Sequence, residues 1–310
     1  MKNIIIILIM TIIIITPITS LAEENYYINK NNVYISLEDY NLLLADYNEE
    51  QIDNFTQNEI NILLTNDWER VGEQIKYYET TNFMDINGNV VISTTNEISE
   101  FIYNNVDPSI IGNNYDMNAS CGTNCVSHET TYKKVSLFVD YGVSVSSTKI
   151  EVRNEWKIIP SVKRFDIIGF KIVSSQNDYI SFMTTLYQAK QIWDGNTINY
   201  SYDTSSTGNT VVQNGVGVGQ VMNIVNDTSN SLINTMTLYL IGSPVGLVIN
   251  ASYQHATSNS ITKNDAKNVS FNGPASGYTI LGGTFRYNNT IANYYDGMQG
   301  VSVSFYDYLS

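Results

Sequence analysis

The chain has 310 residues, of which 43% are hydrophobic and only 15% carry a charge. That hydrophobic fraction can build a core, which argues against a largely disordered chain. The net charge of −14 argues against a nucleic-acid partner, because phosphate contacts need a basic surface.

Residues 1–22 have the pattern of a signal peptide. Lys2 gives a positive start, an apolar run follows from Ile4 to Ile15, and Ser20-Leu21-Ala22 places small residues where a signal peptidase reads them. The apolar run is too short to cross a bilayer as a helix. We therefore expect a mature chain that begins near Glu23 and is secreted into the extracellular space.

The charge divides the mature chain into two parts. Residues 23–120 have a net charge of −15, whereas residues 121–310 have a net charge of zero. We interpret residues 23–120 as an acidic helical and hairpin region, 121–130 as a cysteine-containing linker, and 131–310 as a β-sandwich domain.

Residues 33–66 are predicted to form two or three short helices. Ser36 with Asp39, and Thr56 with Glu59, have the spacing of capping boxes, in which a hydroxyl and an acid satisfy backbone N–H groups at a helix start. Helices this short and amphipathic need a partner surface to be stable.

The pair Asn87-Gly88 lies between two runs of β-forming residues and predicts a hairpin. We expect a type I′ turn, in which both central residues take a positive φ. Asp85 and Asn87 could also open a calcium-binding loop, but the glycine comes too early and the final acid is missing. The hairpin is therefore the preferred interpretation.

Cys121 and Cys125 are the two cysteines of the chain, and His128 follows three residues later. In an exported protein a small-loop disulfide is the favoured interpretation. Unpaired thiols and a metal site are the alternatives, and a metal site would need a further ligand such as His255. We predict no metal and no other cofactor.

From residue 131 onward, strand patterns and turns dominate. Val135, Leu137 and Val139 alternate with mostly polar neighbours, as do Ile150, Val152 and Trp156. On the strand that contains Ile150, charges of alternating sign occupy the other face, so that face should be exposed to water. Residues 165–173 are apolar on both sides and predict a central strand. The fold class is therefore mainly β, an antiparallel β-sandwich.

Four segments of the sequence resemble a known family. They are Tyr77-Tyr78 through Asn87-Gly88, Trp156-Lys157 through Asp166, Tyr253-Gln254-His255-Ala256, and Tyr295-Asp296-Gly297-Met298-Gln299-Gly300-Val301-Ser302. In this order they resemble a family of uncharacterised secreted proteins of low-GC Gram-positive bacteria. The resemblance covers most of the mature chain and implies export and the same order of elements. It carries over no catalytic residue, and the segment from Cys121 to Cys125 has no match in it.

The sequence gives no positive support for an enzyme. A Ser-His-acid hydrolase would have to use His128 or His255, and the chain has no Gly-x-Ser-x-Gly elbow, Walker loop or dinucleotide-binding loop. His255 alternates with Tyr253 along an expected strand, so a hydrogen-bonded structural role is the simpler interpretation.

The preferred function is a secreted, non-catalytic binding or surface-associated β-domain. The chain has 23 tyrosines and 3 tryptophans, and exposed aromatic rings suit both sugar faces and protein hot spots. The expected ligand is therefore a cell-surface glycan or protein. The candidate ligand-contact residues are Tyr253, His255, Tyr294 and Tyr295.

The alternative function is membrane-active or pore-forming. Residues 204–262 contain Asp227 as their one formal charge and are rich in Ser, Thr, Asn and Gly, as lipid-entering hairpins are. The simpler interpretation of this segment is interior strands of the sandwich joined by polar turns.

The charge pattern also predicts how the two parts of the chain meet. Residues 132–172 form the one locally basic segment, with eight basic residues against four acids. We expect the acidic helical region to dock on or near these strands, held mainly by its apolar residues.

Overall fold

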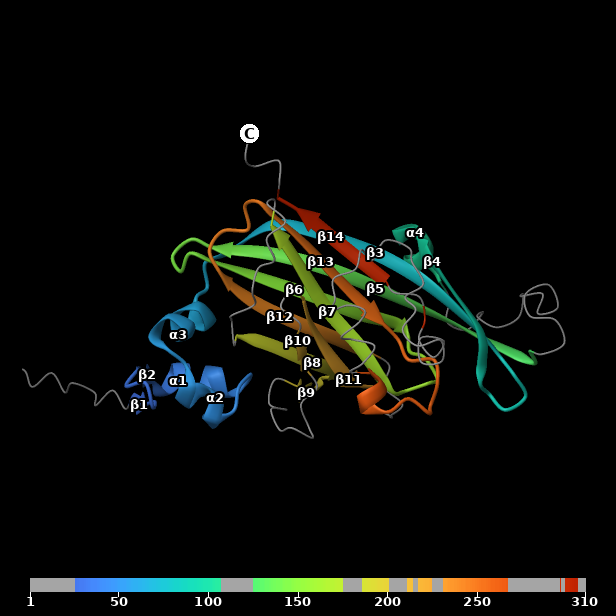
Figure 1. Cartoon of the computed structure of the whole chain (residues 1–310), viewed down its shortest axis with the longest axis horizontal. Coiled ribbons are helices and arrows are strands. Elements are labelled where there is room, and N and C mark those ends of the chain that lie inside the picture. The colour runs from blue at the N-terminus through green and yellow to red at the C-terminus, as the bar shows by residue number, and fades with distance from the viewer. Residues whose placement is uncertain are drawn as a thin grey trace, which may run out of the picture.

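The computed structural model describes residues 26–106, 125–174, 186–200, 211–213, 217–224, 231–266, 296 and 299–305. Two antiparallel sheets lie face to face and enclose the main hydrophobic core, with a small helical module at one end (Figure 1). The predicted fold class, an antiparallel β-sandwich, is confirmed. The predicted signal peptide, Cys121, Tyr294 and Tyr295 lie outside the described residues.

Within the described residues, the larger sheet has seven strands, all paired with antiparallel neighbours. Their order across the sheet is β4 (Val90–Ile98), β3 (Trp68–Met84), β5 (Ser127–Gly142), β6 (Ser147–Ile158), β12 (Leu232–Ile241), β8 (Tyr187–Trp193) and β9 (Asn196–Asn199). Strands β3 and β4 belong to this sheet, so the sandwich begins well before residue 131.

The described part of the chain forms five strands of the smaller sheet, in the order β10 (Val211–Gln213), β11 (Gly217–Asn223), β7 (Phe165–Ser174), β13 (Leu247–Gln254) and β14 (Gln299–Ser304). β7 lies in the middle, as its apolar character on both sides predicts. In the nearly uncharged segment 204–262, β12 and β13 are each paired on both edges. β11 also has a neighbour on each side, whereas β10 is an edge strand, and the rest of the segment lies partly outside the described residues.

Alternation along the strands determines which side chains enter the core. Val135, Leu137 and Val139 of β5, with Ile150 and Val152 of β6, are fully buried between the sheets, as predicted. The charged residues of β6 lie on the opposite face and are partly exposed, which matches their prediction as a water-facing row.

The Asn87-Gly88 hairpin is confirmed, but its predicted type I′ turn is wrong. Gly88 has a φ of +77°, whereas Asn87 is not among the residues with positive φ. The Asp85 N–H donates to the Asn89 carbonyl at 2.9 Å, and the Gly88 N–H donates to the Asp85 carbonyl at 3.0 Å. This is a three-residue loop in which a single left-handed glycine closes the turn.

The helical module consists of β1 (Tyr26–Ile28), β2 (Tyr34–Ser36), α1 (Leu37–Leu44), α2 (Glu49–Asn54) and α3 (Gln57–Leu64). Both predicted caps are present, because Ser36 accepts from the Asp39 N–H and Thr56 forms a capping box with Glu59. A third cap was not predicted from the sequence. It is the Asn48 capping box at the start of α2.

The helical module docks next to the predicted strands rather than on them, because its main contacts are with β8 and with β12, the neighbour of β6. Its apolar residues pack with Leu186 and with Tyr239 on the outer face of β12, and Asp46 forms an ion pair with Lys190 of β8. The prediction named residues 132–172, of which Val145 in the β5–β6 turn packs against this cluster. Charge density alone therefore did not identify the docking surface, which is centred on β8 and β12.

The remaining helix, α4 (Glu100–Asn105), follows β4 and packs against β3 through Tyr103 and Tyr77, whose ring centroids lie 4.9 Å apart. Within the described ranges, no helix is both long and apolar enough to cross a membrane.

Candidate functional site

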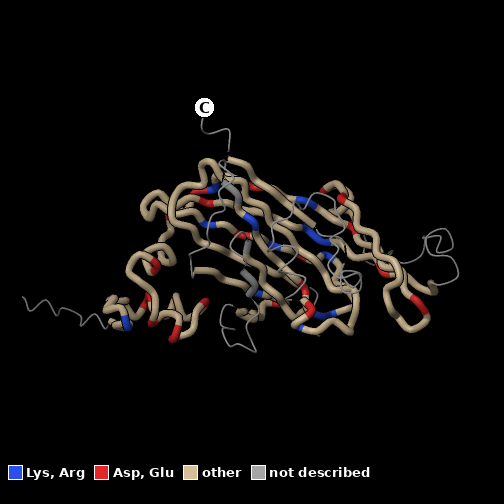
Figure 2. Tube along the Cα trace, in the orientation of Figure 1, with Lys and Arg blue, Asp and Glu red and all other residues tan. Residues whose placement is uncertain are grey.

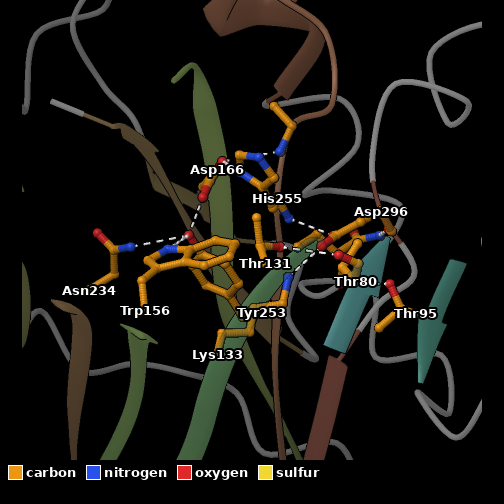
Figure 3. Close-up of polar contacts among 12 residues, drawn as sticks. Thr80, Thr95, Thr131, Lys133, Trp156, Asp166, Asn234, Tyr253, His255 and Asp296 are labelled. Carbon is orange, nitrogen blue, oxygen red and sulfur yellow. Dashed lines mark hydrogen bonds and ion pairs between the residues drawn. The ribbon is translucent and has the colours of Figure 1, made fainter. Parts of the chain in front are cut away.

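Polar side chains occupy part of the space between the two sheets (Figure 3). We call this cluster the interior network, and its members are Lys133, Trp156, Asp166, Gln191, Asn234, Tyr253, His255 and Asp296. The seven-stranded sheet contributes Lys133 on β5, Trp156 on β6, Gln191 on β8 and Asn234 on β12. The five-stranded sheet and its continuations contribute the others. The network therefore ties the two sheets together with directional contacts.

The carboxylate of Asp166 is held by several donors. Its Oδ1 accepts from the Ala256 backbone N–H at 3.0 Å and contacts Nδ1 of His255 at 2.9 Å, and its Oδ2 accepts from the Tyr253 hydroxyl. A buried carboxylate needs such donors, because the water that would otherwise solvate it is excluded. Asp166 thereby fixes the chain just after β13.

The hydroxyl of Tyr253 is the centre of a second set of contacts. It accepts from Asn234 Nδ2 at 3.1 Å and from Trp156 Nε1 at 3.3 Å while it donates to Asp166. Gln191 Nε2 donates in turn to Asn234 Oδ1 at 2.8 Å. Burial, and then the neighbouring charge of Asp166, raise the pKa of Tyr253 well above its usual value. This tyrosine therefore acts as a neutral hydrogen-bonding group.

Lys133 and Asp296 form an ion pair in which both side chains are fully buried. Asp296 Oδ1 also accepts from the His255 backbone N–H at 2.7 Å, and the Asp296 N–H donates to the His255 carbonyl at 2.9 Å. The Lys133 ammonium lies 4.7 Å from the centre of the Trp156 ring. Burial raises the pKa of Asp296, although Lys133 opposes that shift.

Two of the predicted ligand-contact residues, Tyr253 and His255, lie in this interior. Both residues are at most 1% exposed, so neither side chain can contact a ligand that binds on the surface. The simpler prediction for His255, a hydrogen-bonded structural residue, agrees with its contact to Asp166.

Strand alternation in the sequence could have indicated two members of the interior network. Lys133 has the same strand parity as Val135 and Leu137, and Asp166 has the same parity as Ile168 and Phe170. Alternation thus places both charged side chains on the inward faces of their strands. A charged residue at an inward position predicts a buried partner, although parity alone does not say which one.

The interior network has some features of an acid–base catalytic site, but it is closed to substrate. The Asp166–His255 pair resembles the pairs that orient a catalytic imidazole, yet Nε2 of His255 is buried and has no hydrogen-bond partner in the described part of the chain. A substrate would have to enter the sandwich to reach it. The described residues also contain no group of three or more His, Cys, Asp or Glu side chains that could hold a metal ion.

The helical module carries an exposed aromatic patch, which we define as Tyr26, Ile28 and Tyr34. Ile28 lies directly opposite Tyr34 in the β1–β2 pairing, so the three side chains share one face of this ribbon. Tyr34 is 65% exposed and Tyr26 is 46% exposed, and their ring centroids lie 6.2 Å apart at an interplanar angle of 80°.

The opposite face of the ribbon anchors it. The ring of Tyr27 stacks on Tyr40 of α1 with centroids 4.0 Å apart, and its hydroxyl donates to Asp53 of α2. Asn29 Nδ2 donates to the Ile52 carbonyl at 3.0 Å and to the Phe55 carbonyl at 2.7 Å. These contacts hold the aromatic patch in a defined position.

No model of a known protein family matches this chain, and no curated protein is significantly similar to it. Its function therefore has to be inferred from the geometry of the interior network and of the aromatic patch.

Proposed function

We propose that the chain is an exported, non-catalytic binding protein. Its contact surface is the aromatic patch of the helical module, and its partner is a protein with a positively charged surface. Export rests on the signal-peptide pattern of residues 1–22. The observation that carries the binding function is the exposure of Tyr26, Ile28 and Tyr34 on one anchored ribbon.

Exposed aromatic side chains on a rigid element are typical of binding hot spots. A tyrosine presents a large contact area with few rotatable bonds, so little conformational entropy is lost when a partner covers it. Tyr27 and Asn29 already fix the ribbon against α1 and α2. The patch is therefore preorganised for a partner.

The charge around the patch favours a basic partner. Residues 26–67 contain eight acids and one base, which gives a net charge of −7, and Glu38, Glu49 and Glu50 are exposed. Figure 2 shows mainly acidic positions along the helical module, whereas both signs are mixed over the sandwich. Opposite charges at the rim of an interface speed association and exclude wrongly charged partners.

The orientation of the two rings favours a protein over a glycan. A glycan that stacks on two rings at once needs them to be nearly coplanar, and these two rings lie at 80° to each other. A protein side chain can instead insert beside an edge-to-face pair, which is a favourable arrangement of aromatic rings.

The test probes a protein microarray and a glycan array with the labelled mature protein at low and high salt. Basic proteins should be bound, and salt should weaken the binding. Tyr34→Ala should weaken it by about tenfold or more, as expected for a hot-spot residue. Ile241→Ala is the matched control, because Ile241 is 80% exposed but lies on the sandwich.

Binding only to glycans would contradict the proposed partner. Equal binding by Tyr34→Ala and the wild type would contradict the proposed surface. Circular dichroism of each variant verifies that the fold is retained.

A further inference from the structure

The Lys133–Asp296 pair differs from the other ion pairs that Lys and Arg side chains form among the described residues. Both of its side chains are 0% exposed, whereas the Lys or Arg side chain of every other pair in these ranges is at least 21% exposed. An ion pair in water gains little, and one buried this completely loses the hydration of both charges. The position of this pair therefore calls for a further explanation.

Burial penalises the charge on Asp296, whereas the aromatic rings that face Lys133 stabilise its ammonium group. Lys133 Nζ lies 4.7 Å from the ring centre of Trp156 and 5.5 Å from that of Tyr253, so aromatic rings replace water around the amine. Burial raises the pKa of Asp296. Transfer of one proton from Nζ to the carboxylate converts the ion pair into an amine and a carboxylic acid without any net change in charge.

The carboxyl group of Asp296 is held for attack by that amine. Its Oδ2 contacts Lys133 Nζ, and its Oδ1 accepts from the His255 N–H at 2.7 Å (Figure 3). The backbone N–H of Asp296 donates to the His255 carbonyl at 2.9 Å, which fixes the residue on the end of β13. A backbone N–H aimed at Oδ1 stabilises the negative charge that develops there when a nucleophile adds to the carboxyl carbon.

We propose that Lys133 and Asp296 condense to form an intramolecular amide, so that this pair is a self-modification site that joins the two sheets covalently. The reaction requires no partner molecule, because both reacting groups are already in contact within the folded chain.

The chemical steps balance without an oxidant or reductant. The proton moves from Nζ to Oδ2, and the Nζ lone pair then attacks the carboxyl carbon while an electron pair moves to Oδ1. The Oδ2 hydroxyl takes a second proton from the nitrogen and leaves as water, and the electron pair on Oδ1 restores the carbonyl. One C–N bond forms, one C–O bond breaks, and the product is one amide and one water molecule.

The bond would connect distant parts of the chain. Lys133 lies on β5 of the larger sheet, and Asp296 precedes β14 of the smaller sheet, 163 residues later in the sequence. A cross-link over such a long loop strongly restricts the unfolded chain, as a disulfide of the same span does. The burial that favours condensation also keeps water away from the finished amide.

The test is mass spectrometry of the purified, folded, mature protein after reduction, denaturation and digestion with trypsin. The proposal predicts one linked species that contains Lys133 and Asp296, with a mass lower than the sum of its two peptides by one water molecule. Lys133→Arg keeps the positive charge but provides no amine for this reaction, so the linked species should disappear. Lys134→Arg is the matched control, because Lys134 is partly exposed and pairs with Glu155, and its linked species should remain.

Separate, unmodified peptides from folded wild-type protein would overturn the proposal. This measurement decides the question even where Lys133→Arg does not fold, because it uses the wild-type chain alone. A linked species that persists in Lys133→Arg would also overturn it, because the link would then involve another residue. The result is independent of any binding by the aromatic patch.

Discussion

At Tyr253 a single hydroxyl satisfies three polar groups of the sandwich interior. Trp156 and Asn234 donate to it from the larger sheet, and it donates to Asp166 on the smaller sheet. Removing one member of such a network leaves its partners buried without hydrogen bonds, which costs more than one ordinary hydrogen bond contributes. The polar interior therefore specifies how the two sheets face each other.

We predict that Tyr253→Phe lowers the free energy of unfolding by about 2–4 kcal/mol, because Asp166, Trp156 and Asn234 each lose a partner. Urea unfolding at neutral pH measures this change. Tyr34→Phe is the control, since its exposed side chain should change stability by less than about 0.5 kcal/mol. Equal stability of Tyr253→Phe and the wild type would show that the network is energetically unimportant.

At the scale of elements, an irregularity in β3 lets strand β14 approach. The register of β3 against β5 shifts between Arg70 and Gly72. A Cβ atom on Gly72 would lie 2.8 Å from Cζ of Phe305 and 2.8 Å from Cγ1 of Val303. The glycine therefore provides the space into which the buried ring of Phe305 packs.

We predict that Gly72→Ala destabilises the protein by about 1–3 kcal/mol, because the added methyl group overpacks this contact. Combining it with Phe305→Leu should cost less than the sum of the two single changes, since the shorter side chain relieves the clash. Thermal unfolding of the two single variants and the double variant measures this coupling. Strict additivity would mean that the clash is absorbed elsewhere.

The stability of the helical module also depends on its packing against the sandwich. Tyr239 points outward from β12 but is buried beneath the module, and its ring centroid lies 5.9 Å from that of Trp68. Asp46 accepts from Gln188 Nε2 at 3.0 Å and also pairs with Lys190. Short helices gain most of their stability from such packing rather than from their own propensity.

Tyr239→Ala should therefore loosen the module. We expect a loss of about 3–5 kcal/mol, as for a large buried aromatic residue, together with faster protease cleavage within residues 26–67. Limited proteolysis followed by mass spectrometry measures the second effect. Ile241→Ala alters the same face of β12 at an exposed position, and it should leave the cleavage rate unchanged. Similar cleavage in both variants would argue that the module is held mainly by other contacts.

At the scale of the whole molecule, tyrosine burial makes stability depend on alkaline pH. Burial is the largest cause that raises the pKa values of Tyr78, Tyr200 and Tyr239 well above the usual 10.0. Burial also raises the pKa of Tyr103 to about 12. A folded-state pKa above the unfolded value means that the stabilisation is complete below pH 10.0 and decreases as the pH rises above it.

We therefore predict that the melting temperature falls steeply above about pH 10, where tyrosines in the unfolded chain begin to ionise. Ultraviolet absorbance should reveal late tyrosine ionisation that coincides with the loss of far-UV circular dichroism. The exposed tyrosines, such as Tyr34, should ionise before that transition. Complete ionisation of all tyrosines in a chain that stays folded would contradict this prediction.

The sequence by itself determined the features that depend on near neighbours. The caps at Ser36 and Thr56, the hairpin at Gly88 and the inward alternation of β5 and β6 all follow from residues a few positions apart. The predicted turn type was wrong, because the loop contains three residues rather than two. Only its glycine, and not Asn87, takes a positive φ. Local patterns thus predicted several of the elements and the fold class.

Only the tertiary structure decided which surfaces meet. The pairing of Lys133 with Asp296 joins residues that are 163 positions apart, and the burial of Tyr253 and His255 depends on how the two sheets face each other. The docking of the helical module likewise rests on apolar contacts with Tyr239 and on the Asp46–Lys190 ion pair, and both of these partners lie outside residues 132–172. A sequence pattern assigns a side chain to a face of its strand, whereas the identity of its partner is set by the packing of strands distant in the chain.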